Sequence, residues 1–241
     1  MLAPVRLLAC ALGLMLLSAS RPALAQSTGS VASPVIKPGA TFGLAGAVGW
    51  EDGETNFAHR LDYRQTVGET TRLSAIAFFN DRGGAYRFRR FAVEAMHQFA
   101  SDREGWSSAA QARLIVPDGN DGVTGLRLAW INRWKPAVGG ELRLIGLATR
   151  EFGADRESGL ALETRGEATW AIGADTRVGL QTYNRYNNTT NFGAFRTQRH
   201  SVGGVLKGSL TDTVSYRINA VTGMSEPATD FELRFRLNVK L

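Results

Sequence analysis

The last segment of the chain alternates strictly between apolar and polar side chains from residue 231 to residue 241. Successive side chains of a β-strand point to opposite faces, so this period of two predicts a strand with one apolar and one polar face. The alternation continues to the final residue. The apolar positions are Phe231, Leu233, Phe235, Leu237, Val239 and Leu241, and the polar positions are Glu232, Arg234, Arg236, Asn238 and Lys240.

Similar alternation recurs earlier in the chain, at residues 60–64, 110–116, 126–130, 160–172 and 214–220. Together with their flanks, these segments are about as long as the 9–11 residues that a tilted strand needs to cross a bilayer. No apolar stretch after the first 25 residues approaches the ~20 residues of a transmembrane helix. We therefore expect an all-β protein, a single antiparallel up-and-down transmembrane β-barrel.

Turn-forming residues separate these segments and fall into two sets that alternate along the chain. The shorter turns are at 68–70, 101–105, 135–140, 173–176 and 210–213, and the longer loops are at 51–53, 80–84, 117–122, 150–158, 187–194 and 223–229. Transmembrane barrels have short periplasmic turns, longer outer loops and an even number of strands. The pattern predicts about twelve strands, within a range of roughly 10–14, with both chain ends in the periplasm.

One segment allows two interpretations. Phe91, Ala95 and Phe99 are spaced four apart, as in an amphipathic helix over residues 90–100. The same residues also fit a strand in which the alternation shifts after Phe88 at a β-bulge near Arg89 and Arg90. Aromatic residues mark the expected membrane edges, with Trp50 and Tyr86 at one edge and Trp106 and Trp134 at the other.

The terminal strand resembles that of bacterial outer-membrane β-barrel proteins, in which the last strand carries the signal for barrel assembly. In that family the final residue is usually aromatic, whereas this chain ends in Leu241. The resemblance implies a location in the bacterial outer membrane, contact with its lipids and recognition by the barrel-assembly machinery through the C-terminal strand. In size and in its inward-facing arginines, the chain is also similar to small oligogalacturonate-specific porins.

The first residues match a secretory signal peptide. Arg6 precedes an apolar run over residues 7–17, and Ala23-Leu24-Ala25 forms a small-x-small cleavage site. We expect a signal peptide at 1–25, a flexible lead-in at 26–39 and the barrel at 40–241. Cleavage removes Cys10, the only cysteine, so a disulfide framework and a thiolate metal site are excluded.

Cleavage also removes two arginines and leaves 26 basic and 22 acidic residues, a formal charge of 26 − 22 = +4. For an exported basic chain we expect anionic lipid head groups or anionic solutes as partners, and no nucleic acid.

If the apolar positions face lipid, the other positions face the lumen, and these are rich in arginine. The inward acidic residues are fewer: Asp62, Glu94, Glu163, Glu167 and Glu232. Guanidinium groups match the geometry of carboxylate and phosphate groups, so the pattern favours a passive channel for small anionic solutes such as acidic sugars or organic acids. The expected lumen-lining, anion-contacting arginines are Arg60, Arg64, Arg72, Arg87, Arg113, Arg127, Arg143, Arg165, Arg177, Arg217, Arg234 and Arg236.

Three alternatives remain at this stage. Ion pairs fill the interior of many small barrels, so the protein is alternatively a structural or assembly barrel with a charge-plugged lumen. A soluble exported β-protein also shows alternation. An outer-membrane lipid hydrolase or deacylase needs a Ser/His pair, but the three histidines, His59, His97 and His200, are scattered. We expect no catalytic residues, no metal site and no cofactor.

Overall fold

The computed structural model describes residues 29–51, 53–82, 85–103, 105–119, 123–136, 139–154 and 156–241. The expected signal peptide lies outside the described residues. Twelve strands make up most of this part of the chain. They are β1 (Ala40–Glu51), β2 (Glu54–Val67), β3 (Thr71–Arg82), β4 (Ala85–Arg103), β5 (Trp106–Pro117), β6 (Thr124–Trp134), β7 (Gly140–Phe152), β8 (Ala161–Ala171), β9 (Thr176–Asn188), β10 (Arg199–Ser209), β11 (Val214–Gly223) and β12 (Phe231–Lys240).

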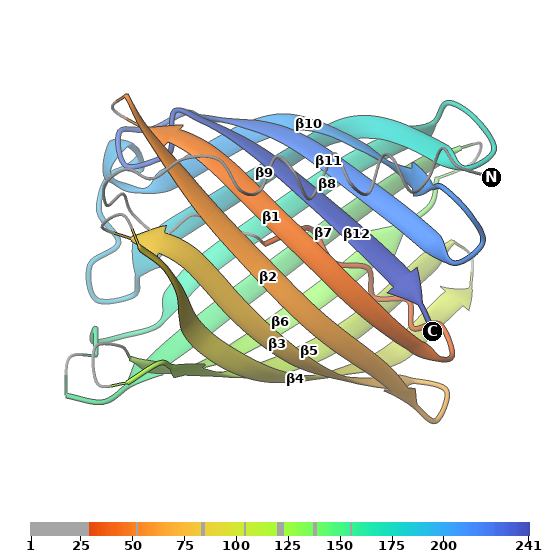
Figure 1. Cartoon of the computed structure of the whole chain (residues 1–241), viewed down its shortest axis with the longest axis horizontal. Coiled ribbons are helices and arrows are strands. Elements are labelled where there is room, and N and C mark those ends of the chain that lie inside the picture. Colours follow the sequence, from red (N-terminus) through yellow and green to blue (C-terminus); the bar gives the residue numbers. More distant parts are fainter. Residues whose placement is uncertain are drawn as a thin grey trace.

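The strands form one closed, fully antiparallel barrel. Each strand pairs with its neighbours in sequence, and β1 closes the barrel by pairing with β12 from Thr41↔Lys240 to Trp50↔Phe231. The strands cross the view obliquely in Figure 1, tilted against the long axis of the barrel. This confirms the predicted all-β barrel of twelve strands. Closure leaves no open sheet edge, the condition for strands to cross a lipid bilayer.

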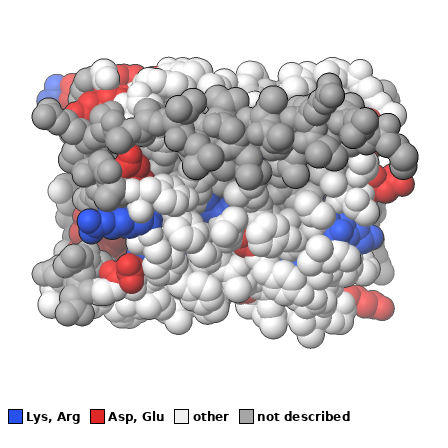
Figure 2. Space-filling model, in the orientation of Figure 1, with Lys and Arg blue, Asp and Glu red and all other residues white. Residues whose placement is uncertain are grey.

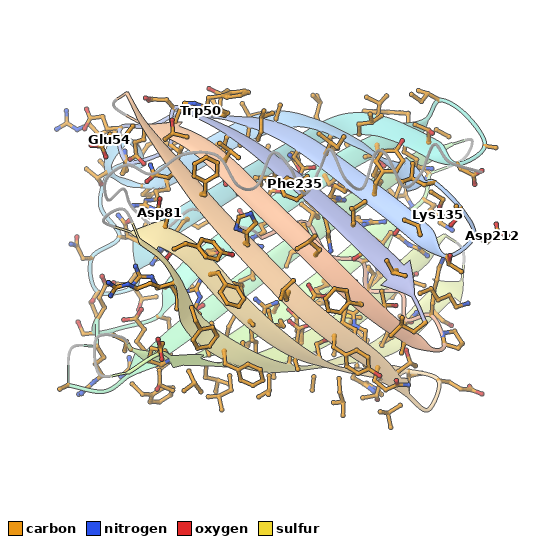
Figure 3. All side chains as sticks on the ribbon, viewed as in Figure 1. Trp50, Glu54, Asp81, Lys135, Asp212 and Phe235 are labelled. Carbon is orange, nitrogen blue, oxygen red and sulfur yellow. The ribbon has the colours of Figure 1, made fainter. Side chains whose placement is uncertain are left out.

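The links between strands divide between the two ends of the barrel as the turn residues predicted. One end holds the short links at 68–70, 104–105, 135–139, 172–175 and 210–213, and the other holds the links at 52–53, 83–84, 118–123, 153–160, 189–198 and 224–230. The link after β9 contains a short 3-10 helix at Phe195–Thr197. In Figure 3, Glu54 and Asp81 lie at the second end, whereas Lys135 and Asp212 lie at the first.

The outer face of the barrel is apolar. Leu128, Leu144 and Leu180 are each more than half exposed, at 55%, 53% and 61%. In Figure 2 uncharged residues cover the middle of the visible face, and most of its charged residues lie toward the two ends. An apolar belt of this extent between polar rims is the surface of a protein embedded in lipid, and it argues against the soluble alternative. No helix of the described residues is long and apolar enough to cross a membrane.

Aromatic side chains lie at the expected edges of this belt. Trp50 and Phe231 contact each other at the end with the longer links, with ring centroids 5.5 Å apart. Trp106 and Trp134 are paired residues of β5 and β6 at the other end, and both are exposed. These positions suit rings that join an apolar body to a polar tip at the lipid–water boundary.

Residues 90–100 belong to a strand, so the helix interpretation is wrong. Strand β4 is continuous, and its register with β3 shifts between Phe78↔Arg90 and Phe79↔Phe88. Arg89 is therefore the extra residue of a β-bulge. Its insertion reverses the alternation and turns Arg90 toward the lumen, because Arg90 now pairs with the inward-facing Phe78.

The interior contains a short stretch of chain besides the inward side chains. Residues 29–38 precede β1 and lie within the barrel, and Val31 and Ile36 are buried to 2% and 7% exposure. Both belong to an apolar cluster with inward-facing residues of β4, β5, β6, β7, β9 and β11, including Met96, Ile131 and Leu147. In Figure 1 this red segment runs behind β1 and β12. The hydrophobic core is thus built between the barrel wall and its own N-terminal segment.

The pairing of β1 with β12, the seam that closes the barrel, contains a position where only glycine fits. The ring of Phe235 on β12 lies over its pairing partner Gly46 on β1, and a Cβ added at Gly46 would be 2.1 Å from the ring. We expect Gly46→Ala to destabilise the folded barrel by about 1–3 kcal/mol, the usual cost of overpacking. The measurement is the temperature at which the detergent-solubilised barrel loses its β-sheet circular dichroism.

Gly146→Ala is the matched control, since Gly146 also lies within a strand but has no atom within 4 Å of an added Cβ. Equal melting temperatures for the two variants would contradict the packing assigned to the seam.

Candidate functional site

The predicted arginines lie mostly in one place, around a cavity of about 710 Å³ inside the barrel. All of them except Arg87 and Arg234 line this cavity. Arg234 is buried against the ring of Tyr183, with its guanidinium carbon 4.4 Å from the ring centroid. Arg87 is exposed near the end of the β3–β4 hairpin. The register brings the inward positions together, because residues paired across neighbouring strands face the same side of the sheet.

Asp62 on β2 is the centre of the densest group of charges. Its carboxylate contacts Arg60 at 3.1 Å, Arg64 at 2.8 Å and Arg236 at 2.6 Å, and its side chain is fully buried. Arg236 reaches it from β12, on the far side of β1. This contact crosses Gly43 of β1, where an added Cβ would be 2.6 Å from Asp62 and 2.7 Å from Arg236. The absence of a side chain at Gly43 therefore allows the two strands to be joined across β1.

Glu94 on β4 holds a second group beside the first. It forms an ion pair with Arg113, its pairing partner on β5, which donates from Nε over 2.8 Å. Arg72 of β3 lies 3.9 Å from the same carboxylate, and the Ser74 hydroxyl donates to it over 3.4 Å. Glu94 is 3% exposed, so these contacts compensate for a charge that water does not reach.

A third group lies on the opposite wall and contains residues that the sequence analysis did not identify. Lys207 of β10 contacts Glu141 at 2.9 Å and Glu167 at 2.7 Å. Arg143 and Arg217 contact these carboxylates as well. The period of two counted back from Arg143 already places Glu141 on the inner face. Lys207 was not found because the glycines of β10 hide the alternation of that strand.

The remaining inward carboxylates each have arginine partners. Glu163 contacts Arg165 at 2.8 Å and Arg127 at 3.4 Å. Glu232 contacts Arg234 at 2.6 Å. The five acidic residues predicted to face the lumen are therefore all paired with cations there, which agrees with the rule that buried charges are neutralised by partners.

Phe78 forms a small aromatic site that the sequence analysis also missed. Arg90 lies over its ring at 4.6 Å from the centroid, Arg60 lies at 5.7 Å, and both arginines line the cavity. Attraction between a guanidinium and an aromatic face explains this arrangement. The bulge at Arg89 brings Arg90 here, and local alternation without the bulge predicts the opposite face.

The N-terminal segment narrows the lumen and is bound to its walls. The backbone N–H of Ile36 donates to Gln98 Oε1 over 2.9 Å. Arg165 and Arg234 donate to the carbonyl oxygens of Ser30 and Gly29 over 3.4 and 3.3 Å. Two of the predicted pore arginines thus bind the protein's own backbone. The cavity is lined by residues of this segment and of the short links, and none of the described residues of the longer links lines it.

The three histidines lie on the outer face, apart from the arginines. The ring nitrogens of His200 contact Asn184 and Gln198, each at 3.0 Å, and Nδ1 of His97 contacts the Thr71 hydroxyl at 3.1 Å. The ring of His59 lies against Tyr86. Ser201, adjacent to His200, faces the lumen with its pairing partner Tyr183, so the two side chains diverge. Within the described residues no group of three or more His, Cys, Asp or Glu side chains is arranged to hold a metal ion.

Comparison with known proteins relates the chain to others by fold. No protein-family model and no curated protein sequence matches it. Among solved structures, the chain is similar to an outer membrane channel from Pseudomonas putida F1, with a TM-score of 0.68, 10% identity, and coverage of 86% of this chain and 97% of that one.

Two further similar structures are porins. The KdgM porin, solved in complex with disordered oligogalacturonate, has a TM-score of 0.62 at 9% identity and covers 83% of this chain and 99% of its own. The NanC porin has a TM-score of 0.62 at 12% identity, covering 82% and 100%. At these identities the likeness concerns the fold. It confirms the outer-membrane β-barrel resemblance, and the expected outer-membrane location agrees with it.

The contacts of the N-terminal segment predict that its removal enlarges the path through the barrel. We expect deletion of residues 26–36 to raise single-channel conductance in planar bilayers several-fold, because conductance grows with the cross-section of the lumen. Circular dichroism checks that the barrel still forms. A truncated barrel that folds and conducts no better than the full chain would contradict this role of the segment.

Proposed function

We propose that the protein is a passive outer-membrane channel for small anionic solutes. The observation that carries the proposal is the excess of inward-facing guanidinium groups over carboxylates around the 710 Å³ cavity. A lumen with low-dielectric walls and charge of one sign focuses its field along the path, which raises the local concentration of the opposite ion. Anions are therefore expected to enter more readily than cations.

The chemistry of the cations favours oxyanions. Nearly all of them are arginines, whose planar guanidinium presents several N–H donors in a geometry that fits carboxylate and phosphate oxygens. Arg90 shows this chemistry beside an aromatic ring, with its guanidinium over the ring of Phe78. Such a pair suits a small organic acid that has both an anionic group and an apolar or ring surface.

The likeness to porins supports transport by diffusion over catalysis. Each of the three similar structures is named a porin or a channel. The described contacts of the histidines include no Ser–His pair, so the lipid hydrolase or deacylase alternative gains no support from the geometry. We also propose that β12 carries the assembly signal read by the barrel-assembly machinery and that outer-membrane lipids contact the apolar belt.

A structural or assembly barrel is the second candidate. The observation that favours it is the occupation of the lumen, which contains paired charges and residues 29–38. Under this interpretation the ion pairs stabilise a filled barrel and the protein serves an envelope complex. The two candidates differ in whether the purified protein conducts ions.

Substitution of Arg90 tests the anion preference of the channel. None of the described ion pairs includes it, so Arg90→Gln leaves no buried carboxylate unpaired. We expect the wild-type reversal potential in a gradient of potassium chloride to show preference for chloride. In Arg90→Gln this preference is expected to fall by at least about twofold, because a unit charge a few ångström from the path contributes on the order of 1 kcal/mol in water.

Arg156→Gln is the matched control, since Arg156 is exposed in the β7–β8 loop and donates to the Gly153 carbonyl oxygen. Cation preference in the wild-type channel would overturn the proposal. A folded protein that never conducts, even without residues 26–36, would leave the structural barrel as the function.

A further inference from the structure

Positive charge is distributed unevenly around the lumen. In the group on the opposite wall, three cations contact two carboxylates, Glu141 and Glu167. Arg177 lines the cavity outside this group and donates to the Thr169 hydroxyl and to backbone oxygens. Around Asp62 and Glu94, by contrast, five arginines contact two carboxylates and leave an excess of 5 − 2 = 3 positive charges. We call these five residues the arginine basin: Arg60, Arg64, Arg72, Arg113 and Arg236.

The arginines around Asp62 and those around Glu94 interact with one another. Arg60 interacts with Arg113 and Glu94 in addition to Asp62 and Arg236. The five arginines come from β2, β3, β5 and β12, and their side chains are between 9% and 19% exposed. Like charges at this density repel one another strongly where water is scarce, so the arrangement is stabilised by any anion that enters it.

The arginine basin faces the cavity, and all five of its arginines line it. The Nε group of Arg72 is buried and has no hydrogen-bond partner, whereas the Nε groups of Arg60 and Arg64 face the Asp62 carboxylate at 3.1 and 2.8 Å. Arg60 in particular has a side chain that is 91% buried (100 − 9% exposed) and lines the cavity. The inner face of β1 between β2 and β12 carries small residues, including Gly43 and Ala45, and the Asp62–Arg236 contact covers Gly43.

We propose that the arginine basin is a binding site for a small anion with two negative charges, either a dicarboxylate or a tetrahedral oxyanion. This rests on the proposed channel function, because the anion reaches the basin through the lumen. A singly charged anion neutralises only one of the three excess charges, whereas a doubly charged anion neutralises two and accepts hydrogen bonds from guanidinium groups on both sides. Asp62 and Glu94 hold the arginine side chains in place and are positioning residues.

The test compares anions of different charge on the full-length mature protein in detergent. Sulfate and malonate at low millimolar concentration are expected to raise the unfolding temperature, and acetate and chloride at equal ionic strength are not. In Arg64→Gln, Asp62 keeps two guanidinium partners, so the barrel is expected to fold. Its half-saturating sulfate concentration is expected to rise by about tenfold or more, the effect of losing one charged hydrogen bond. Arg72→Gln, which leaves Glu94 paired with Arg113, provides a second variant.

Arg177→Gln is the control that removes a lumen arginine outside the basin. We expect it to lower chloride conductance while keeping the half-saturating sulfate concentration of the wild type. Equal responses to sulfate, malonate and acetate, or an unchanged sulfate response in Arg64→Gln and Arg72→Gln, would overturn the proposal. A lower half-saturating concentration for sulfate than for malonate would assign the site to tetrahedral oxyanions. A lower one for malonate would assign it to dicarboxylates.

Failure of this proposal is distinguishable from failure of the channel. A barrel that conducts chloride in preference to potassium but binds sulfate no better than acetate retains the channel function and loses the basin site. A barrel that never conducts but is stabilised by sulfate through Arg64 keeps the site and loses the channel.

Discussion

Closure of the sheet is the constraint on which the rest of the structure depends. In the hydrocarbon layer each backbone N–H and C=O group needs a partner within the protein, and pairing β1 with β12 supplies the last set of these hydrogen bonds. Once the sheet is closed, every second side chain must point inward. The charged residues that alternate with the lipid-facing ones are thereby confined to one narrow interior. A carboxylate buried there is stable only when a cation pairs with it.

The small side chains of β1 determine how the confined charges meet. Gly43 allows Arg236 of β12 to reach Asp62 of β2 across an intervening strand. A larger residue at that position would separate the two strands' charges and leave Asp62 with the arginines of its own strand alone. The same contact joins the arginines of β2 to Arg236 of β12 in the arginine basin. One glycine thus allows the charges of two strands that are not neighbours to form one group.

The N-terminal segment makes part of the barrel interior apolar. Val31 and Ile36 pack on inward-facing apolar residues of the barrel wall. Without the segment, these apolar side chains would face water. Hydrogen bonds from the barrel wall hold the segment's backbone, and two of those described come from Arg165 and Arg234, which also pair with carboxylates. The lumen is therefore divided between a path bordered by arginines and an apolar wall that the chain itself covers.

Local alternation and turn residues by themselves predicted the number of strands, the lipid-facing positions of the strands with clear alternation, the division into short and long links and the inward position of most of the pore arginines. These properties follow from the period of two and from turn residues, which are features of neighbouring residues. Only the tertiary structure decided which charges meet. Arg236 and Asp62 are 174 positions apart in the sequence, and their contact depends on barrel closure and register. The choice between a helix and a bulged strand at residues 90–100 and the insertion of residues 29–38 were also decided there, because strand pairing fixes the register and an irregular segment has no periodicity to read.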